Sequence, residues 1–221
     1  IVVRTEDFRR ETQSYGKQGY GDIQGIWQTV WLEARGTDFI EAFRFETKID
    51  GAVALAAAVS APDGAILTAA FGGNSFSGAA EGGRVRIEMK FENPRLWSPD
   101  APDLYEGTLT LGDDVVSTYF GIREIAAKDG RILLNGEPLY INGTLDQAFH
   151  PAGHFTYPTD KDMRDEAWRL KRLGLNMARI HIKLEEPRKL YWMDKLGVLI
   201  MQDMPCFWGE PNEEARAAYE S

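Results

Sequence analysis

Six polar side chains stand where three short apolar segments in the C-terminal half of the chain end. They are Asp146, Gln147, Arg179, His181, Lys183 and Asp203. Gathered at one edge of a sheet, these groups would form a hydrogen-bonding surface suited to a hydroxyl-rich ligand. A second interpretation stays open from the residues alone: Arg179 and Asp203 could instead be a buried ion pair that holds two adjacent strands together.

The segments that must position these side chains alternate between strand and helix. Strands are predicted at 139–141, 175–182 and 198–201. Thr159 has the position of a helix cap, and the helix that it begins would end at Gly174. Pro187 favours the start of a second helix, which would end at Gly197. Parallel strands joined by helices predict a barrel or a doubly wound sheet, with polar residues 142–147 following the first strand.

The N-terminal half has a different hydrophobic period. Apolar Val85, Ile87 and Met89 alternate with charged neighbours, a pattern of period two that is typical of half-buried strands. Such strands are predicted at 43–49, 53–59, 85–91, 104–111 and 115–122. They favour an antiparallel sandwich, with the glycine-rich segment 72–78 as a loop. The dipeptide Asn135-Gly136 predicts a hairpin that links the two halves.

Composition excludes several classes of function. The formal net charge of −9, without a cluster of Lys or Arg, argues against nucleic acid as a partner. No apolar run approaches the roughly 20 residues that cross a bilayer, so no membrane partner is expected. Nothing in the sequence assigns the protein to a compartment.

Metal and cofactor chemistry are not indicated either. His150 and His154 have the spacing of a helical metal pair, but Pro151 and Gly153 would break any helix between them. Cys206 is the only cysteine, so no disulfide framework or thiolate cluster can form within one chain. No Gly-x-Gly-x-x-Gly segment follows a predicted strand, which argues against a dinucleotide site. We therefore expect neither a metal nor a cofactor.

Five segments, in order along nearly the whole chain, resemble one known family. They are GIWQTVWLE at 25–33, LWSPDAPDLY at 96–105, FGIR at 120–123, LNGEP at 134–138 and LGLNMARIH at 173–181. Together they resemble glycoside hydrolase family 2, the family of β-galactosidases, β-glucuronidases and β-mannosidases. The resemblance implies a multidomain β plus α/β fold. Residues 1–34 would be the tail of a jelly-roll sugar-binding domain, 35–125 an immunoglobulin-like β-sandwich, and 126–221 the first three strands of a (β/α)₈ TIM barrel.

The same resemblance implies a retaining exo-β-glycosidase that acts on β-galactosides, β-glucuronides or similar terminal β-glycosides. Such enzymes use two glutamates, one as acid/base and one as nucleophile. The family places them on the fourth and seventh barrel strands, so this chain is expected to be inactive alone. Glu213 follows Asn212 but has no apolar strand before it, and we interpret it as a solvated helix start. The alternative function is a non-catalytic carbohydrate-binding or interaction module.

Family roles can be carried over to individual positions. Arg179 corresponds to an arginine near the nucleophile, Gln147 to a substrate-contacting histidine with Asp146 beside it, and Asp203 replaces a glutamate. The duties of His181 and Lys183 within this motif stay open. The expected partner is a carbohydrate substrate, with self-association through the incomplete barrel as a further expectation.

Aromatic residues near the expected site could stack on a sugar ring, because an aromatic face matches the axial hydrogens of a pyranose. We expect this of Phe149 and Trp208, and we assign Phe155, Tyr157 and Phe207 to core packing. Trp208 completes the predicted set of substrate-binding residues.

Overall fold

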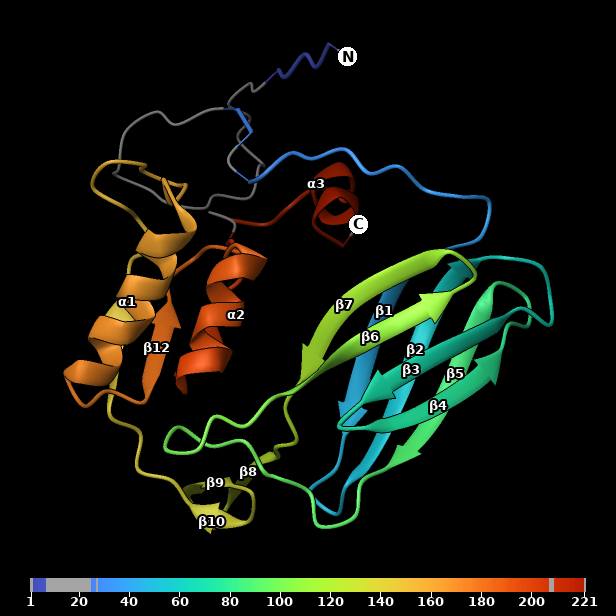
Figure 1. The fold of residues 1–221 in the computed structure, drawn as a ribbon. Helices are drawn as coiled ribbons and strands as arrows, with labels where there is room; N and C mark the ends of the chain where they lie inside the picture. Colours follow the sequence, from blue (N-terminus) through green and yellow to red (C-terminus); the bar gives the residue numbers. More distant parts are fainter. Residues whose placement is uncertain (1, 7–24, 27, 207–208, 221) are drawn as a thin grey trace. The chain divides into compact units, whose positions relative to one another are not determined.

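A computed structural model describes residues 2–6, 25–26, 28–206 and 209–220 (Figure 1). The chain divides into two compact units. The sandwich unit is Leu32–Tyr140, and the β/α unit combines Ile1–Trp31 with Ile141–Ser221. The domain boundaries at 34 and 125 stay predictions. Trp208 and Phe207 lie outside the described residues.

Two antiparallel sheets build the sandwich unit (Figure 1). One has the order β1-β2-β5, with strands Phe39–Thr47, Ala52–Ser60 and Arg84–Lys90. The other has the order β4-β3-β6-β7, with strands Asn74–Ala79, Ile66–Phe71, Tyr105–Leu111 and Asp114–Phe120. The predicted alternation is confirmed in β5, where Val85, Ile87 and Met89 are buried and the charged residues between them are exposed.

An aromatic cluster fills the space between the two sheets. Its rings are those of Phe45, Phe71, Phe91, Tyr105 and Phe120, whose centroids lie 4.8–5.8 Å apart. Buried aromatic side chains contribute large apolar areas, and tilted or edge-to-face pairs add to that stabilisation.

Replacing Phe71 by alanine is expected to lower the free energy of unfolding of the sandwich unit by about 3–5 kcal/mol, because it leaves a cavity in this cluster. Phe71 is 1% exposed, whereas Ile66 on the same strand is 54% exposed. Ile66→Ala is therefore the matched control and should change stability by less than about 1 kcal/mol. Chemical denaturation followed by amide signals of β3 and β6 measures both. Equal effects of the two substitutions would contradict the placement of the core.

The glycine-rich segment at 72–78 is not one loop, so that prediction was wrong beyond Gly73. Gly72 and Gly73, both with positive φ, form a two-residue turn, and Asn74 already pairs with Phe71. A side chain at Gly78 would meet the carbonyl oxygen of Arg86 at 2.9 Å. The small residues of β4 are thus explained by close packing against β5, not by loop structure.

The predicted hairpin at Asn135-Gly136 is confirmed. Strands β8 (Ile125–Lys128), β9 (Arg131–Leu134) and β10 (Glu137–Pro138) form a small antiparallel sheet. Asn135 and Gly136 both have positive φ, as a type I′ turn requires. The Asn135 amide also donates a hydrogen bond of 3.0 Å to the carbonyl oxygen of Trp97, which fastens the hairpin to the rest of the sandwich unit.

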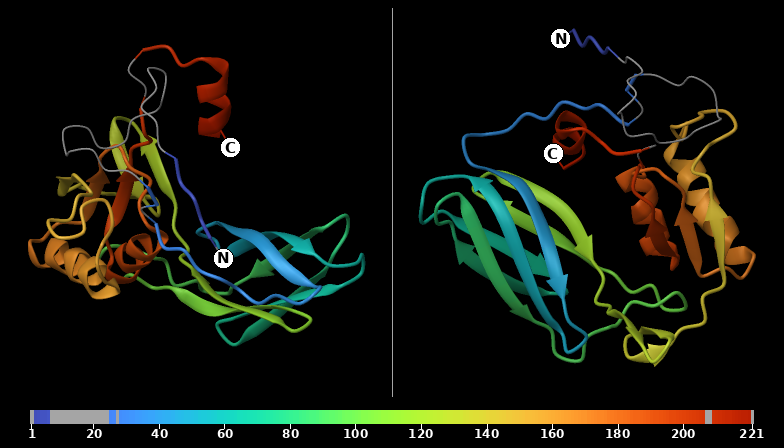
Figure 2. Two further views of the ribbon diagram at one scale, coloured as in Figure 1. Left: turned by 90° about the horizontal axis from the view of Figure 1, so that it is seen from above. Right: turned by 180° about the vertical axis from the view of Figure 1, so that it is seen from behind.

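Three parallel strands form the sheet of the β/α unit, as predicted. They are β11 (Gly143–Asp146), β12 (Met177–Ile180) and β13 (Leu199–Gln202), in the order β11-β12-β13. Helices α1 (Asp160–Arg172) and α2 (Pro187–Leu196) lie side by side and pack on this sheet (Figure 2). The Thr159 hydroxyl caps α1, and Gly197, in the left-handed conformation, ends α2. A third helix, α3, spans Glu213–Glu220.

The first parallel strand was predicted too early in the sequence. Residues 139–141 do not pair with the parallel sheet, and Tyr140 is largely exposed. The strand is instead Gly143–Asp146, within the segment that we expected to follow it. The Asn142 backbone N–H and side-chain amide bind Asn176 and Gly174, and this contact sets the strand's register. None of the described helices is both long and apolar enough to span a bilayer.

Candidate functional site

The register of the parallel sheet decides which strand residues share a face. Arg179 pairs with Leu145 on one side and Met201 on the other, and all three side chains are about half exposed. Ala178 and Ile180 alternate with Arg179 and are fully buried, Ala178 in the core that includes residues of α1 and α2. The sheet therefore has an open face that carries Arg179 and a face covered by helices.

On the open face, Arg179 and Asp203 form a bidentate ion pair. Arg179 Nε lies 3.1 Å from Asp203 Oδ1, and Nη2 lies 2.9 Å from Oδ2. The hydrogen bond from Arg179 holds the pKa of Asp203 below its usual value, and the same contact raises the pKa of Arg179. The side chains are 50% and 20% exposed. The pair joins adjacent strands, as one interpretation predicted, but both charges are open to solvent.

Gln147 and His181 form a second pair at the same ends of the strands. His181 Nδ1 lies 3.1 Å from the amide oxygen of Gln147, which accepts the Nδ1 proton. The backbone N–H of His181 donates to the Asp146 carbonyl oxygen at 2.9 Å, and this bond fixes the two strand ends together. The charge interaction between His181 and Asp203 connects the two pairs. The structure thus brings Gln147, Arg179, His181 and Asp203 together.

Asp146 and Lys183 lie apart from this group of four. In the sheet register Asp146 is level with Ile180, and its side chain therefore points to the helix-covered face. Its carboxylate accepts hydrogen bonds from Lys189 Nζ and the Ala148 backbone N–H, both at 2.6 Å. The Lys183 side chain is 1% exposed and pairs with Glu185 at 2.9 Å. Neither is placed where a sugar could contact it on the open face.

Lys189 is the centre of a buried ionic cluster that sequence reasoning missed. Its ammonium group is 0% exposed and donates to Asp146, Tyr157, Glu166 and Glu185 at 2.6, 2.6, 3.1 and 3.2 Å. Burial alone would lower the pKa of Lys189, but the surrounding carboxylates raise it well above its ordinary value. The sequence does contain one indication of this cluster. Lys189 lies one helical turn before the buried Met193, and a lysine on the apolar face of a predicted helix needs buried partners.

The pKa values of two acids in this cluster, Asp146 and Glu166, are shifted in opposite directions. Burial would raise the pKa of Asp146, but the charge of Lys189 outweighs burial and leaves it lowered. For Glu166, burial and the nearby charge of Asp146 have a larger effect than the charge of Lys189. The pKa of Glu166 is therefore raised above its ordinary value of 4.5. The Tyr157 hydroxyl donates to Glu166, and burial raises the pKa of Tyr157. Tyr157 is buried as the core assignment predicted.

Stability of the β/α unit should therefore depend on pH in a way that Glu166→Gln removes. A raised folded-state pKa means that the folded unit holds its proton more tightly than the unfolded chain. The stabilisation is complete below about pH 4.5 and is lost as the pH rises through the folded-state value. We expect the wild-type unit to lose stability with rising pH relative to Glu166→Gln. Urea denaturation across this range, followed by amide signals of β12, tests the prediction. Parallel pH profiles for the two proteins would contradict it.

The remaining predicted positions have other surroundings. Phe149 lies edge-on to His154, with ring centroids 5.4 Å apart. Nδ1 of His150 accepts from the backbone N–H groups of Ala152 and Gly153. Within the described ranges, no three His, Cys, Asp or Glu side chains are grouped so as to hold a metal ion. Glu213 is the first residue of the exposed helix α3, as interpreted from the sequence.

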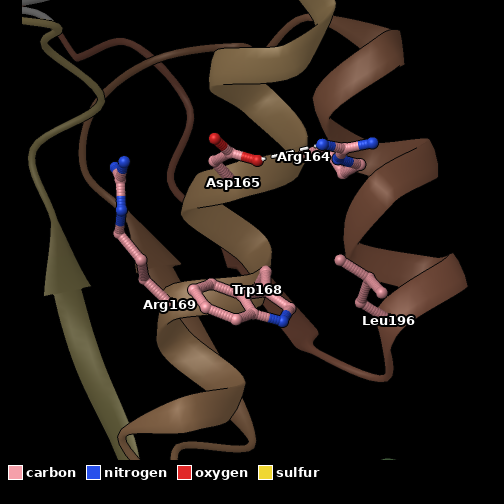
Figure 3. Close-up of a pocket in the computed structure, with 5 residues that line it drawn as sticks. All are labelled: Arg164, Asp165, Trp168, Arg169 and Leu196. Atoms are coloured by element: carbon pink, nitrogen blue, oxygen red, sulfur yellow. Dashed lines mark hydrogen bonds and ion pairs between the residues drawn. The ribbon is translucent and has the colours of Figure 1, made fainter.

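A cavity of about 390 Å³ is lined by side chains of α1 and by the end of α2 (Figure 3). Its lining residues are Arg164, Asp165, Trp168, Arg169 and Leu196. The guanidinium of Arg172 lies 4.7 Å from the centre of the Trp168 ring. Leu196 is the last residue of α2, and the other four lining residues belong to α1. None of the strand-end residues lines it.

Comparison with known proteins relates the chain to enzymes that act on sugars. Residues 39–123 match the family "Glycosyl hydrolases family 2". A β-galactosidase of Leuconostoc mesenteroides is 29% identical over 126 residues, which cover 55% of this chain and 12% of that protein. The solved apo structure of β-glucuronidase 3 from Bacteroides uniformis has a TM-score of 0.70 and 27% identity, covering 82% of this chain and 25% of the other. A family 2 β-galacturonidase of Eisenbergiella tayi, bound to galacturonate, has a TM-score of 0.66 and 25% identity, covering 77% and 33%.

The named relatives are all enzymes that cleave glycosidic bonds. The family model matches the sandwich of this chain, residues 39–123, and the resemblance to family 2 drawn from the five motifs is confirmed. The chain spans 12% of the length of the curated relative and a quarter to a third of the two solved structures.

Proposed function

We propose that this chain is part of a retaining exo-β-glycosidase that hydrolyses terminal β-galactosides, β-glucuronides or similar β-glycosides. The observation that carries the proposal is the open group of four side chains, Gln147, Arg179, His181 and Asp203, at the carboxyl ends of three parallel strands. In barrels built from such strands, this is the end that binds substrate. The names of the relatives, β-galactosidase, β-glucuronidase and β-galacturonidase, support the reaction class.

The proposed division of labour follows the family architecture. Residues 1–34 would end a jelly-roll sugar-binding domain, 35–125 form an immunoglobulin-like sandwich, and 126–221 begin the TIM barrel. The parallel order β11-β12-β13 with helices α1 and α2 between the strands supports the last assignment. The antiparallel sheets of the sandwich unit support the second.

The group of four has the chemistry that sugar binding needs. The amide of Gln147 and the imidazole of His181 offer donors and acceptors for neighbouring hydroxyl groups. Arg179 supplies a fixed positive charge that would keep a nearby carboxylate nucleophile ionised, while Asp203 holds the guanidinium plane in place. Proton transfer and formation of the glycosyl intermediate require two glutamates about 5 Å apart. We propose that they lie on barrel strands outside this chain.

Hydrolysis of chromogenic β-glycosides tests the proposal. The 221-residue chain should give no turnover of nitrophenyl β-galactoside or β-glucuronide, and a gene product that continues past Ser221 into a strand ending in Asn-Glu should give turnover of at least one. Turnover by the chain alone would overturn the assignment of the missing glutamates. A stop codon after Ser221 would favour the second candidate, a non-catalytic carbohydrate-binding module, because the four side chains are assembled without either glutamate.

The open face of the β/α unit should also make the chain self-associate. Leu145 and Met201 are each 50% exposed beside Arg179, and β11 and β13 each have one strand neighbour among the described residues. Exposed apolar surface next to strand edges favours association. The weight-average mass in sedimentation equilibrium is expected to rise with concentration and to fall towards 24.8 kDa when both residues are replaced by glutamate. A monomer at all concentrations in the unsubstituted chain would contradict this expectation.

A further inference from the structure

Each member of the Gln147–His181 pair is followed by a residue with strained backbone. Ala148 and Ile182, directly after Gln147 and His181, both have a φ of 50°. An L-residue rarely adopts this left-handed conformation, and a β-branched residue such as Ile182 does so least of all. Strain of this kind persists only where surrounding contacts impose it, and it is concentrated at functional sites.

The contacts that hold Ala148 come from two charged side chains. Its N–H donates to Asp146 Oδ1 at 2.6 Å, and its carbonyl oxygen accepts from Lys183 Nζ at 3.3 Å. Lys183 Nζ also donates to the Phe155 carbonyl oxygen at 2.7 Å. One buried ammonium group thus fixes both ends of the segment 148–155, which begins beside Gln147.

The same ammonium group anchors the turn that contains Ile182. Lys183 follows Ile182 in the chain, and its Nζ lies 2.9 Å from Glu185 Oε1. The Glu185 backbone N–H donates to the side-chain oxygen of Gln202 at 2.9 Å, and the Ile182 N–H donates to the Asp203 carboxylate. The turn after β12 is therefore fixed both to the Lys183 ammonium and to the end of β13.

A second lysine completes the arrangement from the helix side. Lys189 bridges Asp146, at the end of β11, and Glu185, in the turn after β12, at 2.6 and 3.2 Å. Lys183 and Lys189 share Glu185, so the anchors of Ala148 and Ile182 belong to one continuous buried network. Asp146, Lys183, Glu185 and Lys189 lie off the open face, and Asp203 is the one anchor of Ile182 that lies on it with Arg179.

We propose that Lys183 is a positioning residue: with Glu185 and Lys189 it holds the strained backbone at Ala148 and Ile182, and so orients the Gln147 amide and the His181 imidazole to bind two neighbouring hydroxyl groups of a sugar. The nature of the ligand rests on the proposed function, whereas the positioning rests on the geometry alone. Lys183 does not contact the sugar. It acts through the backbone at Ala148 and Ile182, the residues that follow the sugar-binding Gln147 and His181.

Lys183→Met in the 221-residue chain tests the positioning. Glu185 keeps Lys189 and the Glu186 backbone N–H as partners, so the substitution removes one ammonium without leaving a carboxylate unpaired. The sequence has only three histidines, so imidazole signals can be assigned in heteronuclear NMR spectra. We expect the protected Nδ1 proton signal of His181 to be lost in Lys183→Met and kept in Lys161→Met, a control on the exposed side of α1. A folded Lys183→Met protein with the wild-type His181 signal would overturn the proposal.

Rescue distinguishes positioning from a general loss of stability. Glycine adopts positive φ without strain, so adding Ile182→Gly to Lys183→Met should restore the His181 signal at least in part. No restoration in a folded double variant counts against the proposal. If Lys183→Met does not fold, Glu185→Met replaces it, because it removes the acceptor that Lys183 and Lys189 share, while Lys183 keeps the Phe155 carbonyl oxygen and Lys189 keeps Asp146. An unchanged His181 signal in a folded Glu185→Met protein would then overturn the proposal.

Titration with glucuronic acid and with galactose separates this inference from the proposed function. In the wild-type chain one of the sugars should shift the His181 signals, and Lys183→Met should weaken that response about tenfold, which corresponds to 1.4 kcal/mol. Loss of the His181 signal in Lys183→Met, combined with no response of the wild-type chain to either sugar, would overturn the proposed ligand while supporting the positioning role. An equal sugar response in both proteins would overturn the positioning role.

Discussion

Replacing Lys189 by methionine is expected to lower the free energy of unfolding of the β/α unit by about 3–5 kcal/mol, because it removes one partner of a buried ionic cluster. Asp146 would lose the hydrogen bond from the ammonium group and keep the one from the Ala148 N–H, and Glu185 would keep Lys183. The side chain of Lys189 is 0% exposed, so water cannot replace the missing ammonium without opening the packing of α2. A stability loss of that size approaches the whole stability of a small unit.

Hydrogen exchange of the Ala178 and Ile180 amides measures this loss, since both lie in the buried strand next to the cluster. Lys161→Met is the matched control: Lys161 is 70% exposed and pairs with Asp165 on the surface of α1, so its loss should change stability by less than about 1 kcal/mol. Exchange in Lys189→Met that is as slow as in the control would show that the cluster contributes no net stability.

Local signals made most of the fold predictable from the sequence. The alternation of Val85, Ile87 and Met89 marked a half-buried strand, and Thr159, Pro187 and Gly197 marked helix ends through capping and backbone geometry. Strand β4 was missed because its small residues carry no hydrophobic period. Their role is to let β5 approach closely, which is a tertiary contact.

Which residues share the candidate site depends on the exact bounds of each strand, because neighbouring side chains of a strand point to opposite faces of the sheet. Placing the first parallel strand at 139–141 left Asp146 in a loop beyond it, free to share the open face with Arg179. In the structure Asp146 is the last residue of β11, and the alternation of side chains turns it towards the helices. Lys189 and Glu166 are separated from Asp146 by 43 and 20 positions in the sequence, so no local pattern could join them.

If the complete protein is the β-glycosidase that we propose, replacing its Arg179 by lysine is expected to lower kcat/KM by about 100-fold. The guanidinium makes two parallel hydrogen bonds to Asp203, and a lysine ammonium cannot reproduce that planar contact. The positive charge would remain, but its position relative to the proposed nucleophile would no longer be fixed. Because the side chain is half exposed on the open face, its replacement should leave the packing of the unit intact.

Steady-state hydrolysis of a chromogenic β-glucuronide or β-galactoside measures this effect, with thermal unfolding as the check on folding. Arg188→Lys is the matched control, because Arg188 has a similar exposure of 51% and pairs with Asp160 at the start of α1 instead of with Asp203. Its kcat/KM should stay within about threefold of wild type, since surface ion pairs contribute little. A similarly small change in Arg179→Lys would mean that the bidentate contact with Asp203 serves only to join β12 and β13. In that case Arg179 and Asp203 would be interpreted as an ion pair that joins two strands, and the proposed role of Arg179 beside the nucleophile would be given up.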